Sequence, residues 1–295
     1  MMQLRRIAGM LALVTLLLLL NVASVLAATT TDWENATITV EGTGPMPANA
    51  YNAVQARMMA RRVAIVDAYR QLAEQIKGVN VDATTTVENM MVTSDRVTTH
   101  VNALIQGARI VDEKVIAGGG YSVKMQLSIF GAGNSLASAV FDRPVVREDF
   151  PVPAESVQPA VPEISTQPII RADGQSSAAA SPSGLAIGGF TGLIVDCRGL
   201  GLKPVMSPVI KNAAGTAIYG YKNLDYDAVV KNGMAGYTHD INKAERAGSN
   251  PLVVKAVSLA NHNGNPVLSI ADANRVLIEN GATGFLNEAR VVFVR

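Results

Sequence analysis

Only a few groups of residues in this sequence suggest a binding site or a reaction, and these groups are far apart in the sequence. Asp196 and Arg198 follow the apolar run Leu193-Ile194-Val195, and Lys203 comes shortly after. Open α/β sheets tend to bind ligands where their buried strands end, so these charges predict a site for an anion or a cell-wall fragment. The simpler interpretation is that they are solvated charges at the end of a strand.

A second group of charges lies in an alanine-rich stretch. Arg57 and Arg61 are four residues apart there, and Arg62 is next to them. On a helix, Arg57 and Arg61 share one flank, which would attract an acidic partner or lipid phosphates. The alternative is that these long side chains extend along the edge of a neighbouring sheet.

Motifs for catalysis or metal binding do not accompany these charges. The three histidines are scattered, and no HExxH motif or Cys/His ligand spacing occurs. Cys197, the single cysteine, has no base beside it and is expected to be a small buried apolar residue. We therefore expect no cofactor, no metal and no enzymatic activity. The alternative is an envelope enzyme or ligand-binding receptor with a pocket in the second half of the chain.

Length and charge limit the class of protein. The chain has 295 residues, 48% of them hydrophobic, which is enough for two compact domains. It carries 25 basic and 24 acidic residues. This balance argues against nucleic acid as a partner, because phosphate contacts need a clustered basic surface.

The first 27 residues have the pattern of a signal peptide. A basic start, MMQLRR, precedes a long apolar run and then small residues up to Ala27. We expect cleavage after Ala27 and export to the periplasm or to the outer membrane. An uncleaved membrane anchor is the alternative. Lipid attachment is not expected, because no cysteine stands directly after the signal, at Ala28 or nearby.

A long helix over residues 50–77 organises the first domain. Its apolar residues are expected on one side and its alanines on a second side, where the backbone of a curved sheet comes close. These two sets are Val54, Met58, Ile65, Tyr69, Leu72 and Ile76, and Ala53, Ala56, Ala60 and Ala64. Gly78 is expected to end the helix in a left-handed conformation.

Alternating patterns around this helix predict strands. They lie over residues 36–41, 79–87, 108–116 and 121–129, with a short helix from Ser94 or Asp95 to Gly107. The sequence Gly42-Thr43-Gly44 is interpreted as a strand-to-helix turn. It is not a dinucleotide-binding loop, because Pro45 and Pro47 follow it. Residues 36–131 are thus predicted to form an α+β domain, a long helix on a curved, mostly antiparallel four-stranded sheet.

The second half begins with a linker. Residues 142–185 contain seven prolines and the run QSSAAASPSG, a composition typical of an extended spacer. Residues 189–295 then predict a small mixed α/β domain. Its strands are expected near Leu193, Leu252 and Val267, and a last strand at residues 290–294.

Three runs in the first domain resemble a family of bacterial envelope proteins. They are QARMMARRVAIVDAYRQLAEQIKGVNVDATTTV from Gln55, SDRVTTHVNALIQGARIVDE from Ser94 and YSVKMQLSIFG from Tyr121. The family joins the Lpp-twenty surface lipoproteins to the amino-terminal domain of flagellar assembly protein T.

This resemblance implies a non-catalytic envelope protein, which in the flagellar relatives helps to build the ring around the motor. The chain departs from the lipoprotein branch because it lacks the signal cysteine, and from the flagellar branch in its second half. We expect a structural, assembly or binding component. Its partners would be envelope proteins, copies of itself, the cell wall or a membrane surface.

Overall fold

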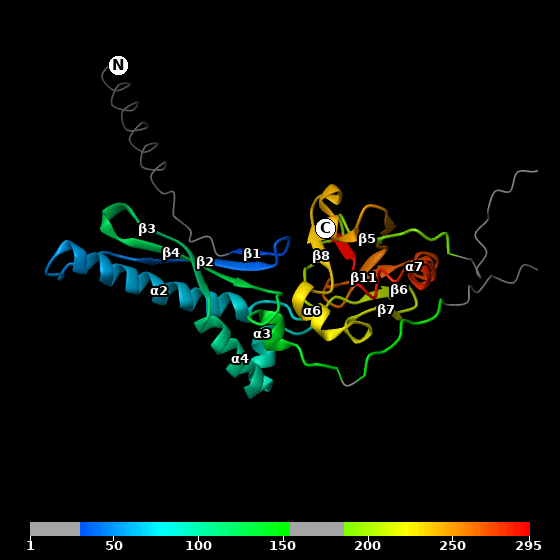
Figure 1. The fold of residues 1–295 in the computed structure, drawn as a ribbon, viewed down its shortest axis with the longest axis horizontal. Coiled ribbons are helices and arrows are strands. Elements are labelled where there is room, and N and C mark those ends of the chain that lie inside the picture. The colour runs from blue at the N-terminus through cyan, green and yellow to red at the C-terminus, as the bar shows by residue number, and fades with distance from the viewer. Residues whose placement is uncertain (1–29, 145, 154–185) are drawn as a thin grey trace, which may run out of the picture.

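The computed structural model describes residues 30–144, 146–153 and 186–295. The expected signal peptide and most of the proline-rich segment lie outside these described residues. The first domain is elongated along its long helix, and the second domain lies against one end of it (Figure 1).

The first domain is built on an antiparallel sheet with the strand order β1-β2-β4-β3. Its strands are β1 (Thr30–Asp32), β2 (Thr37–Gly44), β3 (Arg109–Val115) and β4 (Tyr121–Ser128). In β2, buried and half-buried residues alternate strictly, with Ile38 and Val40 in the core. The long helix α2 (Ala53–Lys77) lies along one face of this sheet (Figure 1). The predicted α+β fold class is confirmed.

The contact between α2 and β2 corrects two of the predictions. The buried stripe of α2 recurs every four residues, at Ala56, Ala60, Ala64, Ala68, Leu72 and Ile76. Val54 and Met58, expected in the core, are exposed. Gly42-Thr43-Gly44 is part of β2 and not a turn. A Cβ built at Gly42 would lie 2.2 Å from the Ala64 carbonyl oxygen, so this packing needs glycine on the strand and alanine on the helix.

Residues 79–87 form no strand, which corrects another prediction. Val79 and Val81 are buried as their spacing suggested, but the backbone bends and makes a single antiparallel bridge, between Asn80 and Thr86. The fourth strand of the sheet is β1, from a stretch that showed no alternating pattern. Gly78 ends α2 in a right-handed conformation, with φ −76°, and not in the expected left-handed one.

Three shorter helices complete the first domain. They are α3 (Val87–Thr93), α4 (Asp95–Gln106) and α5 (Leu136–Val140). The predicted cap at Ser94 is confirmed, because its side chain accepts a hydrogen bond from the backbone N–H of Val97. Helix α4 ends at Gly107, as its sequence predicted, and it buries Val97, Val101 and Leu104.

The second domain contains two four-stranded sheets. One is entirely parallel, with the order β8-β12-β5-β9, and is formed by β5 (Gly192–Asp196), β8 (Gly236–Thr238), β9 (Pro251–Lys255) and β12 (Val291–Val294). The other has the order β10-β11-β6-β7 and is mixed, with strands β6 (Ile210–Asn212), β7 (Ala217–Tyr219), β10 (Ser258–Ala260) and β11 (Asn265–Leu268). The four residues of β12 are all buried, because this strand is central in its sheet.

Two helices accompany these sheets, α6 (Tyr226–Asn232) and α7 (Ile270–Thr283). Helix α7 is capped by Ser269, whose side chain accepts a hydrogen bond from the backbone N–H of Asp272, and it ends at Gly284, which has the left-handed conformation. Its Glu279 is fully buried and is 2.8 Å from Arg275. Both carboxylate oxygens of Glu279 also accept hydrogen bonds, from the backbone N–H groups of Ile187 and Gly188.

Backbone hydrogen bonds join the two domains. The carbonyls of Asn80 and Val81 accept from the N–H groups of Met206 and Ser207, at 3.0 and 2.7 Å. Gly131 donates to the Val230 carbonyl at 2.8 Å. The bent segment after α2 therefore serves as a contact with the second domain.

The end of α5 and the first residues of the predicted linker also pack on the second domain. Phe141, which follows α5, stacks on Tyr221 with ring centroids 5.1 Å apart, and Phe150 of the linker stacks on Tyr219 at 6.4 Å. Lys222 pairs with Glu148. Within the described residues, the chain is thus anchored as far as the beginning of the proline-rich segment.

Candidate functional site

Asp196 and Arg198 lie at the carboxyl edge of the parallel sheet, as the sequence predicted. Asp196 ends β5 and is in register with Lys255 at the end of β9. The Arg198 guanidinium donates to both carboxylate oxygens of Asp196, at 2.9 and 2.7 Å. These hydrogen bonds hold the pKa of Asp196 below its usual value. The Asp196 carboxylate and the Arg198 guanidinium thus form a bidentate ion pair with each other, and both groups are engaged within the chain.

Cys197, between these two residues, is buried. Burial in apolar surroundings and, to a smaller extent, the nearby Asp196 carboxylate together raise the pKa of its thiol to about 12. The thiolate is the nucleophilic form of cysteine, so this side chain is unsuited to nucleophilic chemistry near neutral pH.

Lys203 does not join the pair. It lines a groove of 230 Å³ between the domains, together with Asn80, Ala83, Thr84, Val205, His262 and Gly264. Neither Asp196 nor Arg198 lines this groove. Asn80 and Thr84 come from the bent segment after α2. They are distant from Lys203 in the sequence, and the packing of the two domains brings them to the same groove.

The β8 end of the same sheet edge is occupied by the first domain. Trp33, in the turn between β1 and β2, packs edge-on against Tyr237 with ring centroids 5.6 Å apart. The Glu34 carboxylate accepts hydrogen bonds from the Thr238 hydroxyl at 3.1 Å and from the His239 backbone N–H at 3.3 Å. A position where α/β sheets commonly bind ligands is therefore used for contact between domains.

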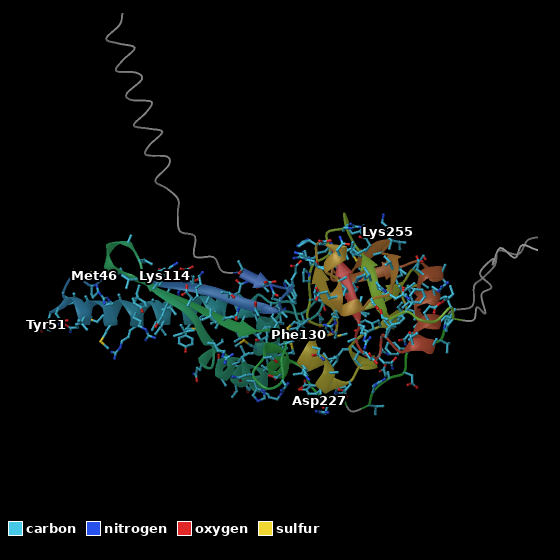
Figure 2. All side chains as sticks on the ribbon, turned by 45° about the horizontal axis from the view of Figure 1, so that its top comes forward. Met46, Tyr51, Lys114, Phe130, Asp227 and Lys255 are labelled. Atoms are coloured by element: carbon cyan, nitrogen blue, oxygen red, sulfur yellow. The ribbon has the colours of Figure 1, made fainter. Side chains whose placement is uncertain are left out.

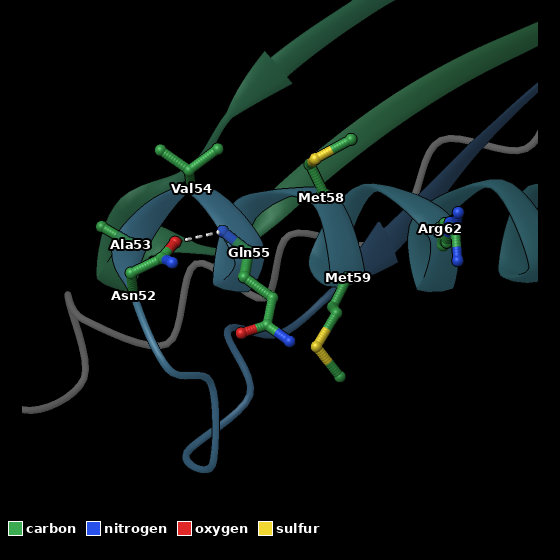
Figure 3. A pocket seen from close by; sticks show the side chains of 7 residues that line it. All are labelled: Asn52, Ala53, Val54, Gln55, Met58, Met59 and Arg62. Carbon is green, nitrogen blue, oxygen red and sulfur yellow. Dashed lines mark hydrogen bonds between the residues drawn. The ribbon is translucent and has the colours of Figure 1, made fainter.

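The arginines of α2 are on the surface. Arg61 pairs with Glu113 of β3 at 2.8 Å, whereas Arg57 and Arg62 are exposed. Figure 3 shows Val54 and Met58 together on one side of the first turns of α2, with Met59 projecting from another side. These residues, Arg62 and the start of the helix line an open depression of 710 Å³.

This apolar surface was missed by reasoning from the sequence. The signal that would have revealed it is the four-residue spacing of the alanines, combined with two glycines on the preceding strand. Together they place the small residues against the sheet, and Val54 and Met58 then point to the solvent.

Strand β3 is a second surface that the sequence did not single out. It lies at one edge of its sheet, and all seven of its residues are exposed. The register shifts between Ile110 and Asp112, which leaves Val111 as a bulge. Val111 and Val115 are exposed apolar residues on this edge.

The described residues contain neither a cluster of metal-binding side chains nor a membrane-spanning helix. No group of three His, Cys, Asp or Glu side chains in this part of the chain is arranged to hold a metal ion. No helix within the described ranges combines the length and the hydropathy that a membrane span requires.

Comparison with known proteins gives two matches to protein families. Residues 45–128 match the LPP20 lipoprotein family. The first domain is LPP20-like. Residues 192–295 match the second domain of Treponema pallidum Tp0624. No curated protein matches the chain.

The LPP20-like match confirms the resemblance expected from the sequence and supports an exported, envelope-associated protein. The match covers α2, α3, α4, β3 and β4. It therefore includes the apolar depression and the edge strand of the LPP20-like domain. It does not include Asp196, Arg198 or Lys203, which lie in the region similar to Tp0624.

Proposed function

We propose that this chain is a non-catalytic structural or assembly component of the cell envelope, which acts by binding other envelope proteins or further copies of itself. The observation that carries the proposal is that contacts within the chain occupy the carboxyl edge of the parallel sheet. Glu34 and Trp33 of the LPP20-like domain occupy its β8 end, and Asp196 is held by Arg198 at its β5 end. Groups that would otherwise meet a ligand are engaged within the chain.

The open edge of the LPP20-like sheet is the surface proposed for partner binding. An edge strand offers unpaired backbone groups, and a partner can add a strand there. The bulge at Val111 interrupts pairing near the start of β3, so residues 112–115 are the regular run on which a partner would align. A ring of copies is one assembly that such an edge would support.

Photocrosslinking in intact cells tests this surface. A photoreactive amino acid replaces Val111 on β3 in one variant and Val92 on α3 in the control; these valines are 50% and 83% exposed. We expect Val111 to capture one envelope protein or a second copy, identified by mass spectrometry, and Val92 to capture neither. Equal capture at both positions would refute the edge as a specific contact. A substrate consumed by the purified protein would overturn the non-catalytic assignment.

A second candidate function is the binding of a small anion in the groove between the domains. It is favoured by the ammonium group of Lys203 and the imidazole of His262, which line the groove beside the polar side chains of Asn80 and Thr84. Calorimetry with inorganic phosphate and with small carboxylates, on the wild type and on Lys203→Gln, distinguishes this function. Binding that is lost in Lys203→Gln would support it, and the absence of heat in the wild type would exclude it for these anions.

A further inference from the structure

The outer end of α2 exposes several apolar side chains beside arginines. Tyr51 is 93% exposed, Val54 67% and Met58 61%. Met46 and Met59 are exposed as well. We call this set, with Arg57 and Arg62, the α2 tip. Figure 2 shows Met46 and Tyr51 at the far end of the LPP20-like domain, away from the second domain.

Packing inside the domain cannot cover the α2 tip. Here the helix meets the sheet through Ala56 and Ala60, and Gly44 of β2 lies against Ala60 so closely that a Cβ would be 2.0 Å from the Ala60 oxygen. The face of the helix opposite this contact is therefore directed outward. Contiguous exposed apolar residues of this kind mark a site of interaction with a protein or a membrane.

The charge on the tip selects among its possible partners. From Pro45 to Val66 the sequence contains three arginines and no acidic residue. Among the residues that the structure describes, only Arg61 of these three has an acidic partner, Glu113, which comes from β3. The tip thus presents two exposed, uncompensated guanidinium groups among aliphatic and aromatic side chains.

A second copy of the chain fits this surface poorly. In a symmetric contact the same patch is present on both sides, so Arg57 and Arg62 would meet arginines and no acid. A free anion in solution would satisfy the arginines, but it would leave Tyr51, Val54 and Met58 in water. An anionic bilayer satisfies both requirements, because its headgroups carry phosphate and its acyl chains lie directly below.

We infer that the α2 tip binds the surface of a membrane containing anionic phospholipids. Val54, Met58 and Tyr51 enter the boundary between headgroups and acyl chains, and Arg57 and Arg62 bind phosphates at the level of the headgroups. This is peripheral binding, and it is independent of the partner contact proposed for β3. The second domain lies at the opposite end of α2, so it does not obstruct the approach of a bilayer (Figure 1).

Vesicle cosedimentation tests the inference. The exported chain, beginning at Ala28 and keeping every described residue, is mixed with vesicles of phosphatidylcholine alone or with added phosphatidylglycerol. We expect binding to the mixed vesicles, weaker binding to phosphatidylcholine, and loss of binding as salt is added. Arg57→Gln with Arg62→Gln should reduce affinity about fivefold for each arginine. Val54→Ser with Met58→Gln should reduce it about tenfold.

Two matched control variants test whether the loss of vesicle binding is specific to the α2 tip. Arg147→Gln removes an exposed arginine from the segment that packs on the second domain, and Val66→Ser removes a valine that is 68% exposed further along α2. Both should bind vesicles as the wild type does, and circular dichroism should show every variant folded.

Three results would overturn the inference. The first is no binding to the mixed vesicles, and the second is binding that both tip variants retain. The third is a concentration-dependent dimer in sedimentation equilibrium that the tip substitutions abolish while vesicle binding persists. That last result would assign the α2 tip to a second copy.

Discussion

Single glycines decide how closely α2 approaches its sheet. Gly42 and Gly44 face Ala60, Ala64 and Ala68 at distances that leave no room for a Cβ. Larger aliphatic residues in place of these alanines would force the helix and the sheet apart. They would thus separate Ile38 and Val40 from Leu72 and Ile76. The small residues therefore allow the larger ones, further along the same helix, to form the core.

Gly42→Ala should destabilise the LPP20-like domain by about 2 kcal/mol, because the new methyl group overpacks the contact with Ala64 and Ala68. Urea unfolding at an unchanged m-value measures this free energy. Gly281→Ala is the control, since nothing lies within 4 Å of its added Cβ and it lies in helix α7. That variant should be more stable than the wild type by up to about 1 kcal/mol. Equal free energies in the two variants would contradict the close contact.

Cys197 should react slowly with thiol reagents at pH 8 while the protein is folded, and rapidly in denaturant. Its folded pKa of about 12 lies above the ordinary value of 9.0, so the folded thiol stays protonated. The sign follows from this difference: its contribution to stability is complete below pH 9 and is lost as the pH rises towards 12. The reaction is followed by the absorbance of the coloured product that the thiol reagent releases. Rapid labelling of the folded protein would show an accessible thiolate.

At the scale of elements, helix α7 anchors the chain where it enters the second domain. The buried Glu279 binds Arg275 and the backbone of Ile187 and Gly188. Glu279→Ala should cost about 3 kcal/mol, because it leaves the N–H groups of Ile187 and Gly188 without their acceptor and Arg275 without its counter-charge. Glu288→Ala, which removes an exposed partner of Arg290, should cost less than about 1 kcal/mol. Thermal unfolding compares the two, and equal midpoints would refute the anchor.

The elements that could be predicted from the sequence are those in which local pattern and tertiary packing agree. β4 alternates in sequence and has one buried face, and α4 has both a cap and an apolar stripe. Residues 79–87 alternate equally well, and Val79 and Val81 are buried, but the backbone bends there and the carbonyls of Asn80 and Val81 bond to the second domain, so alternation there does not indicate a strand. β1 has three residues and exists because β2 pairs with it, which no local pattern could reveal.

The candidate site was less predictable because it depends on distant parts of the chain. Asp196 and Arg198 are two residues apart, and their positions at the end of β5 were expected. That Lys203 faces Asn80 and Thr84, and that Glu34 reaches Thr238, depends on how the two domains pack. Arg57 and Arg61 were expected to share a flank of α2, but the pairing of Arg61 with Glu113 requires the sheet.

At the scale of the whole molecule, the two domains should respond together when their contact is disturbed. Gly264 approaches the first domain so closely that a Cβ would lie 2.7 Å from the Cβ of Ala83. Gly264→Ala should weaken the contact by about 1–3 kcal/mol. It should also shift the emission of Trp33, the single tryptophan, to longer wavelength, because that ring packs on Tyr237 of the other domain. Unchanged emission and stability would show that the contact tolerates the methyl group.

The uninterrupted course of α2 has a mechanical consequence. Its 25 residues include neither proline nor glycine, so the helix has no hinge and extends for about 37 Å. One end carries exposed Val54 and Met58, and the other leads directly into Asn80 and Val81, which are bonded to the second domain. A force applied to the outer end of α2 would therefore be transmitted along the rigid helix to its other end. The resulting strain would fall on the hydrogen bonds that join Asn80 and Val81 to the second domain.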